Sequence, residues 1–589
     1  MFLRLRTFFN QTLTTGPALF RRLRIAFSNI DPAQKGLIII QIDGLSANRL
    51  QRALKRRHMP FVKRLLRKRR SRLYRYLSEI PTSTPAFQGG MFYGDNENIP
   101  GFNFYDKREQ RIYRMGDSEC AYNVESKFTN PGLLRHGSVF SCVYSGGAEA
   151  SLFVFSSLLA PKRWRFALRV YDLIVLTLIH ATVVAKIIAL ALIELVAGSW
   201  DFIKRVRNKG GVVRELEIIA IRIGLSVISR ELITLGAVID IFRRVPVVYI
   251  NYLGYDEYAH LRGPNSRFAM WSLRSIDRSI RRIHRASRYA ERSYDVYILS
   301  DHGQSACKPF SLAAGQSIVE LLQSALANMA VKHETHLDEK TSQLLLSWQG
   351  TTRLAQNLPW YLRGPVNKYS KYLERKFREA AQKSREWEDL FDLTVVSTGP
   401  IAYAYWTNSA DKVTVETIEQ EHPGLLDRLA SHSSVGIVTA VRDDGLVLAK
   451  SGSHHALISE TGIISQSGTM PYDRARNRDH AVRGLWRITR FARSGDICIW
   501  GGYAPSGDIS YSYEMGCHSG WTDEETEAFV IAPKGTDFDF SQIVRHKEFY
   551  EFFSKRYGPW CVQGKNLAPM DPRAVTEAAH VTLSAANSD

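Results

Sequence analysis

The sequence predicts an α/β fold built on a central, mostly parallel sheet. Three short runs, at residues 36–42, 245–253 and 294–299, are rich in β-branched residues and bounded by polar ones, which is typical of buried strands. Apolar residues at helical spacing between residues 266 and 292 join the last two runs, giving the strand–helix–strand order of a parallel crossover. An aspartate follows each run, so we expect three carboxylates at one edge of the sheet.

Composition limits the classes of protein to which the chain can belong. Its 589 residues, of which 45% are hydrophobic, suffice for a large core and exclude a disordered or fibrous protein. A formal net charge of +20 favours anionic partners, whether lipid headgroups, nucleic acid or phosphorylated substrates. The six cysteines lie far apart without a CxxC pair, which argues against a disulfide scaffold and against a cysteine zinc finger.

Residues 1–35 form an N-terminal arm that mixes phenylalanines with arginines. This composition suits a basic amphipathic segment lying on an anionic bilayer, and equally suits a partly ordered arm that packs on its own domain. The arm lacks the uninterrupted apolar core and the small-residue cleavage site of a secretory signal peptide. We therefore expect a cytoplasmic protein that is either free or peripheral at a membrane.

The stretch after the first strand is strongly basic. Between residues 50 and 66 apolar side chains recur at helical spacing, and arginines and lysines continue from Arg52 to Arg72. This pattern predicts one or two covering helices with a very basic outer face. Such a face is most often only solvated, although together with the N-terminal arm it favours a membrane surface as a partner.

A run of hydroxyls comes next, trapped between Pro81 and Pro85. Pro85 biases Thr84 away from helical geometry, and the small residues after it allow a helix to begin. A hydroxyl just before a helix is either an N-cap or a nucleophile whose phosphorylated form the helix dipole stabilises. Spacing alone leaves both interpretations of Thr84 open.

Residues 173–200 are the most apolar stretch and are long enough to span a bilayer. A single crossing would put Asp43 and Asp301 on opposite sides of the membrane, which is incompatible with a shared site. A membrane-dipping hairpin, an interfacial helix and a soluble cap helix remain, and Lys186 and Glu194 within the stretch favour the last two.

The rest of the chain suggests one large domain, residues 36–560, with helical insertions. We expect these insertions at about residues 150–243 and 320–390, the second polar and rich in lysine. Short alternating runs predict strands of a mixed sheet at residues 393–397, 402–406, 436–441 and 446–449, and a further strand at 528–532. His454 and His455 lie in a turn-rich segment and are expected to be solvated. The small, polar tail at residues 561–589 is expected to be disordered.

Residues that bind metal ions recur at the loop positions flanking these strands. The set consists of Asp43, Thr84, Asp256, His260, Asp301, His302 and His518. A lone aspartate and histidine four residues apart are usually solvated, but here two Asp/His sets follow two strands. Three aspartates and three histidines suit two borderline divalent ions such as zinc, with the threonine hydroxyl as a further ligand. Two such ions about 4 Å apart can promote an in-line phosphoryl displacement.

The order of these motifs resembles the alkaline phosphatase superfamily, and most closely its type I phosphodiesterase/nucleotide pyrophosphatase branch. The motifs are Asp43-Gly44, Thr84, Asp256-x-x-x-His260, Asp301-His302-Gly303 and Gly516-x-His518. The resemblance covers roughly residues 36–310 and 390–535. It implies an alkaline-phosphatase-like three-layer sandwich with a central, mostly parallel sheet and helical insertions.

The resemblance also implies a role for each site residue. Asp43, Thr84, Asp301 and His302 would hold one zinc ion, and Asp256, His260 and His518 would hold the other. Thr84 would be the nucleophile, forming a phospho-threonine that water then hydrolyses without a protein general base. Tyr105 falls where the family has a substrate-binding asparagine and Asn103 lies two residues earlier, and either can donate a hydrogen bond to substrate. No arginine of the kind that grips monoesters is identifiable, which favours diesters.

We therefore predict a metal-dependent phosphodiesterase or pyrophosphatase that acts on an anionic phosphate ester and does not bind nucleic acid specifically. One alternative is a headgroup phosphotransferase of the phosphoglycerol or phosphoethanolamine type, although such enzymes usually carry several clear membrane spans. The other is a non-catalytic, membrane-associated binding protein. Retention of all seven ligands argues against the latter, since a protein without a catalytic role has little reason to gather these charges.

Overall fold

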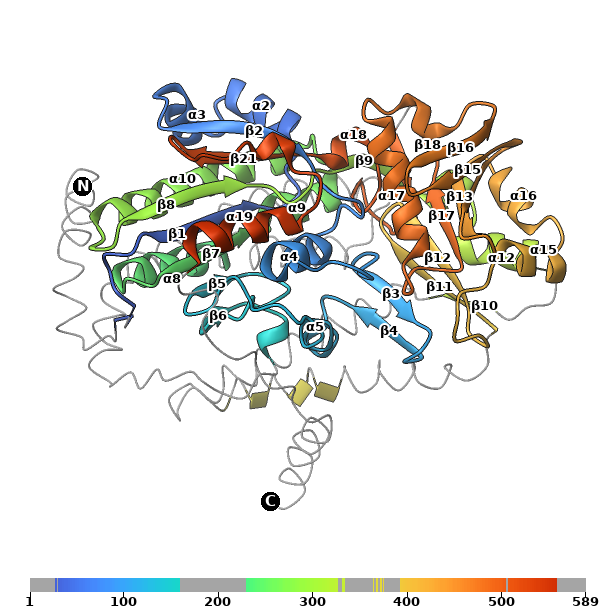
Figure 1. Ribbon diagram of the computed structural model, residues 1–589, viewed down its shortest axis with the longest axis horizontal. Helices are drawn as coiled ribbons and strands as arrows, with labels where there is room; N and C mark the ends of the chain where they lie inside the picture. Colours follow the sequence, from blue (N-terminus) through green and yellow to red (C-terminus); the bar gives the residue numbers. More distant parts are fainter. Residues whose placement is uncertain are drawn as a thin grey trace, which may run out of the picture.

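The computed structural model describes residues 27–28, 30–158, 229–326, 331–333, 392–504 and 507–558, with a few positions between 364 and 375. Two sheets, of seven and eight strands, carry most of the described fold (Figure 1). The predictions for the arm before residue 27, the apolar stretch 173–200, most of both insertions and the tail concern residues outside these ranges. In the part of the chain that is described, no helix is long and apolar enough to cross a membrane.

The central sheet is mostly parallel, as the sequence predicts. Its strands, in spatial order, are β2 (Ser71–Leu77), β21 (Glu527–Pro533), β8 (Tyr294–Leu299), β1 (Gly36–Ile42), β7 (Val247–Tyr252), β5 (Ser138–Phe140) and β6 (Ala150–Leu152). The strand β1 pairs in parallel with both β7 and β8, so the three predicted strands lie side by side. Among the described strands of this sheet, β21 is the one that runs in the opposite direction, since it pairs antiparallel with both β2 and β8. The carboxyl ends of β1, β7 and β8 therefore meet at one edge.

Helices cover both faces of the central sheet, which explains why β1 is apolar throughout rather than alternating. Leu37 and Ile39 contribute to a core with the helices α4 (Thr84–Tyr93), α5 (Ser118–Glu125) and α19 (Lys547–Tyr557). Ile38 and Ile40 face the opposite way, toward α2 (Ala47–Lys55), α3 (Pro60–Arg67), α8 (Arg230–Phe242) and α10 (Arg267–Tyr289). The three-layer sandwich is thus confirmed (Figure 1).

The predicted helix between the last two ligand strands is α10. It begins at Ser266, whose side chain accepts a hydrogen bond from the Ala269 N–H and so caps the first turn. Asp277 on its buried side accepts hydrogen bonds from the backbone N–H groups of Phe61 and Val62. These bonds dock α10 against α3. With α2, α3 accounts for the one or two basic covering helices that the sequence predicts.

The second sheet is antiparallel except at one edge. Its order is β10 (Val331–His333), β11 (Leu393–Thr398), β12 (Ile401–Trp406), β17 (Ile497–Gly501), β13 (Val435–Val441), β14 (Val447–Ser451), β15 (His454–Ser459) and β16 (Gly462–Ser467). Only β10 and β11 pair in parallel. Four of these strands match predictions, but His454 and His455 lie in β15 rather than in a turn, although both are exposed as expected. The helix α17 (Arg478–Arg490) packs on this sheet and faces the loop before Thr84.

A small sheet brings the last motif to the site. The strand β9 (Ser305–Pro309) follows Asp301 and His302 directly, and it pairs antiparallel with β20 (Gly516–Cys517). This pairing carries His518, which is more than 200 residues away in the chain, to the carboxyl end of β8.

Candidate metal centre and active site

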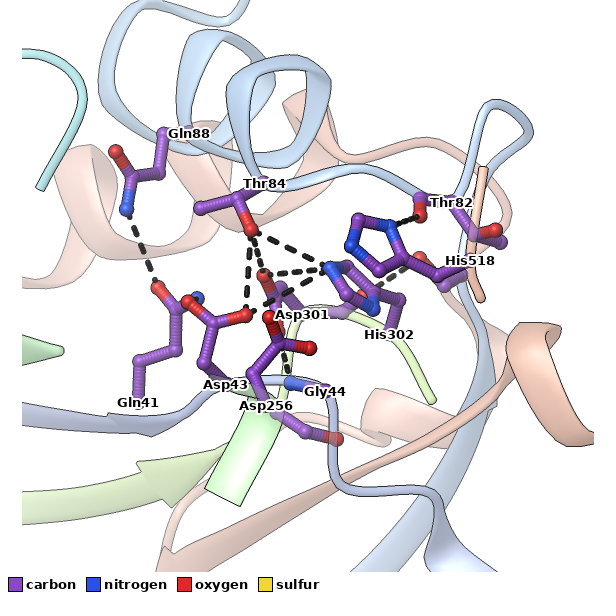
Figure 2. A network of polar contacts seen from close by, with 12 residues as sticks. Gln41, Asp43, Gly44, Thr82, Thr84, Gln88, Asp256, Asp301, His302 and His518 are labelled. Carbon is purple, nitrogen blue, oxygen red and sulfur yellow. Dashed lines mark hydrogen bonds and ion pairs between the residues drawn. The ribbon is translucent and has the colours of Figure 1, made fainter. Parts of the chain in front are cut away.

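The side chains predicted to bind metal converge at the carboxyl edge of the central sheet. Figure 2 shows Asp43, Asp256, Asp301, His302 and His518 pointing toward one another below Thr84. All six are buried. Asp43 follows β1, Asp301 and His302 follow β8, and Asp256 lies in the first turn of α9 (Gly254–Arg262), just after β7.

Thr84 is the first residue of α4, and its hydroxyl faces the carboxylates. Its Oγ1 lies 2.9 Å from Asp301 Oδ2, 3.3 Å from Asp43 Oδ1 and 3.3 Å from His302 Nε2. The N-cap position belongs to the extended residue Ser83, whose side chain makes no capping hydrogen bond. An anion attached to Thr84 Oγ1 would therefore sit at the positive end of the α4 dipole.

Asp43, Asp301 and His302 make up what we call the first ligand group. One ligand atom from each lies within 4.8 Å of the other two. Burial raises the pKa of Asp43 well above its usual value, and the neighbouring carboxylates of Asp301 and Asp256 raise it further. Burial likewise raises the pKa of Asp301. A divalent cation would relieve this crowding of negative charge, so the donor set fits a metal ion.

Asp256, His302 and His518 make up the second ligand group, whose ligand atoms also lie within 4.8 Å of one another. His302 thus belongs to both groups, and its ring stacks on that of His518 with centroids 4.0 Å apart. Burial lowers the pKa of His518 well below its usual value, and the His302 ring lowers it further. A neutral imidazole is the form that binds metal.

His260, which the resemblance assigns to the second metal, lies beside the second ligand group. Its Nε2 is 3.1 Å from Asp256 Oδ2, and its ring centroid is 4.9 Å from that of His518. On the other side, Nδ1 lies 2.7 Å from Glu514 Oε2 and 2.9 Å from the Gly516 carbonyl oxygen. Burial opposes protonation, but the carboxylates of Asp256 and Glu514 raise the pKa of His260 well above its usual value.

The glycines of the motifs are required by close packing around the ligands. Gly44 has φ +67°, and a Cβ there would lie 2.1 Å from Asp256 Oδ1. A Cβ on Gly303 would lie 2.0 Å from the Glu524 carbonyl oxygen, and one on Gly516 would lie 2.5 Å from that of Ala259. Each glycine therefore allows backbone or carboxylate to approach where a larger residue would push a ligand strand away.

Several residues that hold the ligand side chains in place were not predicted from the sequence. Asn251 Nδ2 donates to Asp43 Oδ2 at 2.6 Å, and Gln41 Nε2 donates to the same oxygen at 3.4 Å. Gln304 donates to Asp256 Oδ1. Asn251 and Gln41 are fully buried polar residues within apolar strands. A polar residue in an apolar strand is unusual, and this feature of the sequence could have identified both as candidates. For Glu514 the sequence contains no such indication beyond its position four residues before His518.

The loop before Thr84 is fixed from several directions. Ser78 Oγ donates to the Asp301 carbonyl oxygen at 2.6 Å and lies 3.0 Å from His546 Nε2, which also accepts from the Glu79 N–H at 3.0 Å. Glu79 forms ion pairs with Arg487, at 2.7 Å, and with Arg545.

Further along the same loop, His518 Nδ1 contacts the Thr82 carbonyl oxygen at 2.9 Å. Ser519, the residue after His518, donates its N–H to Thr82 Oγ1 at 3.0 Å. The loop that carries Thr84 is therefore tied to ligand residues on β8 and after β20.

The two candidate substrate-binding residues lie on β3 (Asn103–Asp106). Asn103 Nδ2 donates to the Ser397 carbonyl oxygen at 3.4 Å, and the Tyr105 ring packs edge to face on Tyr405 with centroids 5.5 Å apart. Their role in substrate binding stays a prediction.

Comparison with solved structures finds similar chains at low identity. A phosphonoacetate hydrolase from Sinorhizobium meliloti 1021, in complex with phosphonoformate, is 13% identical with a TM-score of 0.43, covering 89% of this chain and 96% of that one. An inactive murine ectonucleotide pyrophosphatase / phosphodiesterase 5, in complex with AMP, is 10% identical with a TM-score of 0.41, covering 91% and 98%. No curated protein sequence matches the chain.

Comparison with models of protein families identifies the family of the chain. The model of the type I phosphodiesterase / nucleotide pyrophosphatase family matches residues 37–451, which is most of the chain and includes the motifs from Asp43 to His302. This match confirms the resemblance predicted from the motif order. The chain therefore belongs to the type I phosphodiesterase / nucleotide pyrophosphatase family.

Proposed function

We propose that the protein is a two-metal phosphohydrolase that cleaves phosphodiester or pyrophosphate bonds through a covalent phospho-threonine on Thr84. Membership of the family supports a phosphodiesterase/pyrophosphatase-type hydrolase. The observation that carries the finer proposal is the position of Thr84 Oγ1, within 3.3 Å of Asp43, Asp301 and His302 and at the start of α4.

The residues present fit two divalent ions, which we take to be zinc. Asp43, Asp301, His302 and Thr84 Oγ1 would hold the first ion, and Asp256, His260 and His518 would hold the second. We assign His260 to the second ion because its Nε2 already faces Asp256, while Glu514 holds its Nδ1. When bound, the ions would supply positive charge that favours ionised threonine and stabilises the departing oxygen.

The chain's own groups then define the two chemical steps. Thr84 Oγ, having released its proton to solvent, attacks phosphorus as the bond to the leaving alcohol or phosphate breaks. The departing oxygen takes up a proton, and a phospho-threonine remains at the N-terminus of α4. Pro85 has no N–H and the Phe87 N–H donates to the Ser83 carbonyl oxygen, so in the first turn the N–H groups of Thr84 and Ala86 would stabilise the added charge. Water then attacks the phosphorus, releasing phosphate or a phosphomonoester and restoring the hydroxyl, which donates to Asp301 Oδ2 in the resting protein.

The proposal is tested with the purified full-length protein, loaded with zinc and assayed on an aryl phosphodiester and the matching monoester. We expect cleavage of the diester, its abolition in Thr84→Ala, and acid-stable radiolabelled phosphoprotein after quenching turnover of a labelled substrate. Ser83→Ala is the matched control, because the buried Ser83 hydroxyl has no hydrogen-bond partner among the described residues. Full activity in Thr84→Ala would refute the covalent step, and products transferred to an added alcohol rather than water would indicate a phosphotransferase.

A further inference from the structure

A strongly charged surface lies outside the active site, and we call it the cationic face. It consists of exposed arginines and lysines from α2, α3 and the turns that follow each, together with one row on α10. Its members are Arg52, Lys55, Arg56, Arg57, Lys63, Arg64, Arg67, Lys68, Arg69 and Arg70, with Arg274, Arg281 and Arg288 from α10. These helices cover the same side of the central sheet (Figure 1).

The cationic face has almost no acidic counterpart. From Arg49 to Arg75 the sequence contains no aspartate or glutamate. The only acid on α10 is Asp277, which is 2% exposed and whose carboxylate already accepts hydrogen bonds from the start of α3. Within the described residues, no cation of this face forms an ion pair with a carboxylate. The positive charge is therefore not neutralised by the described fold.

Contacts between the helices show that their cations share one surface. The Phe61 ring on α3 packs edge to face on His284 of α10, with centroids 5.4 Å apart. Burial lowers the pKa of His284, and the cations Arg288 on α10 and Arg70 after α3 lower it further.

A second histidine, His58, is also close to cations from two different helical segments. Burial lowers the pKa of His58, and Arg274 on α10 and Arg56 after α2 add to this effect. Cations that lie far apart in the sequence thus lower the pKa of the same histidine, which means that they lie close together in the fold. Because no described carboxylate pairs with these cations, an external anion or screening salt would relieve their mutual repulsion.

We propose that the cationic face docks the protein on an anionic phospholipid bilayer. The face consists of the outer sides of helices, and α10 alone runs for about 35 Å, so it can meet many headgroups at once. Most of its cations are arginines, whose planar guanidinium groups pair with phosphate oxygens in bidentate fashion.

The remaining side chains of the face favour a bilayer over a nucleic acid. Tyr289, at the end of α10, is 53% exposed, and an amphipathic ring beside cations is typical of a membrane–water interface. Gln51 is the one exposed amide on α2 and α3, so apart from it only arginines and lysines, which pair equally well with lipid phosphates, could contact a base from these helices. This inference does not depend on the proposed catalytic mechanism.

Vesicle sedimentation of the full-length protein tests the proposal. The vesicles contain phosphatidylcholine alone or phosphatidylcholine with phosphatidylglycerol, in about 0.1 M and about 1 M salt. One variant combines Arg64→Gln, Arg67→Gln and Arg281→Gln. The matched control combines Arg474→Gln, Arg483→Gln and Lys555→Gln, which are also exposed but lie outside the cationic face. Circular dichroism of both variants should match that of the wild type, which would show that they are folded.

We expect the wild type and the control to bind only the anionic vesicles, and only at low salt. The cationic-face variant should bind about a hundredfold more weakly, at roughly fivefold for each cation removed. Equal binding by this variant and the wild type, or no binding of wild type to anionic vesicles, would overturn the proposal. So would binding of a short DNA duplex that displaces the protein from the vesicles at equal phosphate concentration.

Discussion

The first and second ligand groups share His302 but differ in how their charge is balanced. The first group buries two carboxylates almost completely, Asp43 at 1% and Asp301 at 0% exposed, and burial raises the pKa of both. In the second group Asp256 faces imidazoles. Burial by itself would raise the pKa of Asp256, but His260 outweighs this effect and holds that pKa well below its usual value. The first group thus depends on an added cation, whereas histidines partly neutralise the second.

The largest expected effect comes from removing a carboxylate of the first group. Asp43→Asn should lower kcat/KM at least about a thousandfold, roughly 4 kcal/mol of transition-state stabilisation, because the first metal would lose a charged ligand. Zinc content measured on the purified variant should fall from about two ions to one. Normal zinc content and normal activity would contradict the assignment of Asp43.

The same variant should have the opposite effect on the stability of metal-free protein. Because the pKa of Asp43 is raised in the folded state, its stabilising contribution is present below the unfolded pKa near 4 and is lost as pH rises through the folded pKa. Chelator-treated wild type should therefore lose thermal stability relative to Asp43→Asn between pH 4 and pH 8. If the melting temperatures of the two proteins instead changed equally across that pH range, the negative charge of Asp43 would have to be neutralised in another way.

A smaller effect is expected from Glu514, which orients His260 without touching Asp256. Glu514→Gln should weaken zinc binding at the second site and lower activity by about 10- to 100-fold. The first site should keep its ion, which metal titration of the variant can show. Loss of both ions together would mean that the two groups cannot be separated, and the comparison between them would fail.

The junction between the two groups can be tested through Gly44. Gly44→Ala should cost more than the roughly 1–2 kcal/mol of a left-handed residue, because its Cβ would also collide with Asp256 Oδ1. Gly452→Ala is the control, since Gly452 has φ +56° and a Cβ there would meet nothing within 4 Å. Urea unfolding measures the difference between the two. Equal losses of stability would show that Asp256 moves aside freely.

The smallest effect is expected from Ser78, whose hydroxyl contacts the Asp301 backbone and the His546 ring but no ligand side chain. Ser78→Ala removes the bond to the Asp301 carbonyl oxygen and should lower kcat by up to about tenfold, or roughly 1.4 kcal/mol, with little change in KM. Steady-state kinetics on the aryl diester separates the two constants. A change confined to KM would argue that Ser78 acts on substrate binding instead.

Local patterns account for what was predictable about the fold. The strands β1 and β8 and the helix α10 follow from short-range periodicity, and their observed bounds agree closely with the predicted runs. The strand β15 was missed because His454 and His455 interrupt its apolar pattern, and only pairing with β14 and β16 makes it a strand. Pairing between strands depends on partners that no local window contains.

The sequence by itself determined the family and the central parallel sheet, and it predicted the seven side chains of the site, because most of their motifs lie within a few residues of a strand end. Only the tertiary structure showed that His302 lies between both ligand groups and that Glu514 holds His260, 254 residues away. It also brought the arginines of α10 beside those of α2 and α3. Such contacts arise from packing between distant segments, which spacing along the chain does not encode.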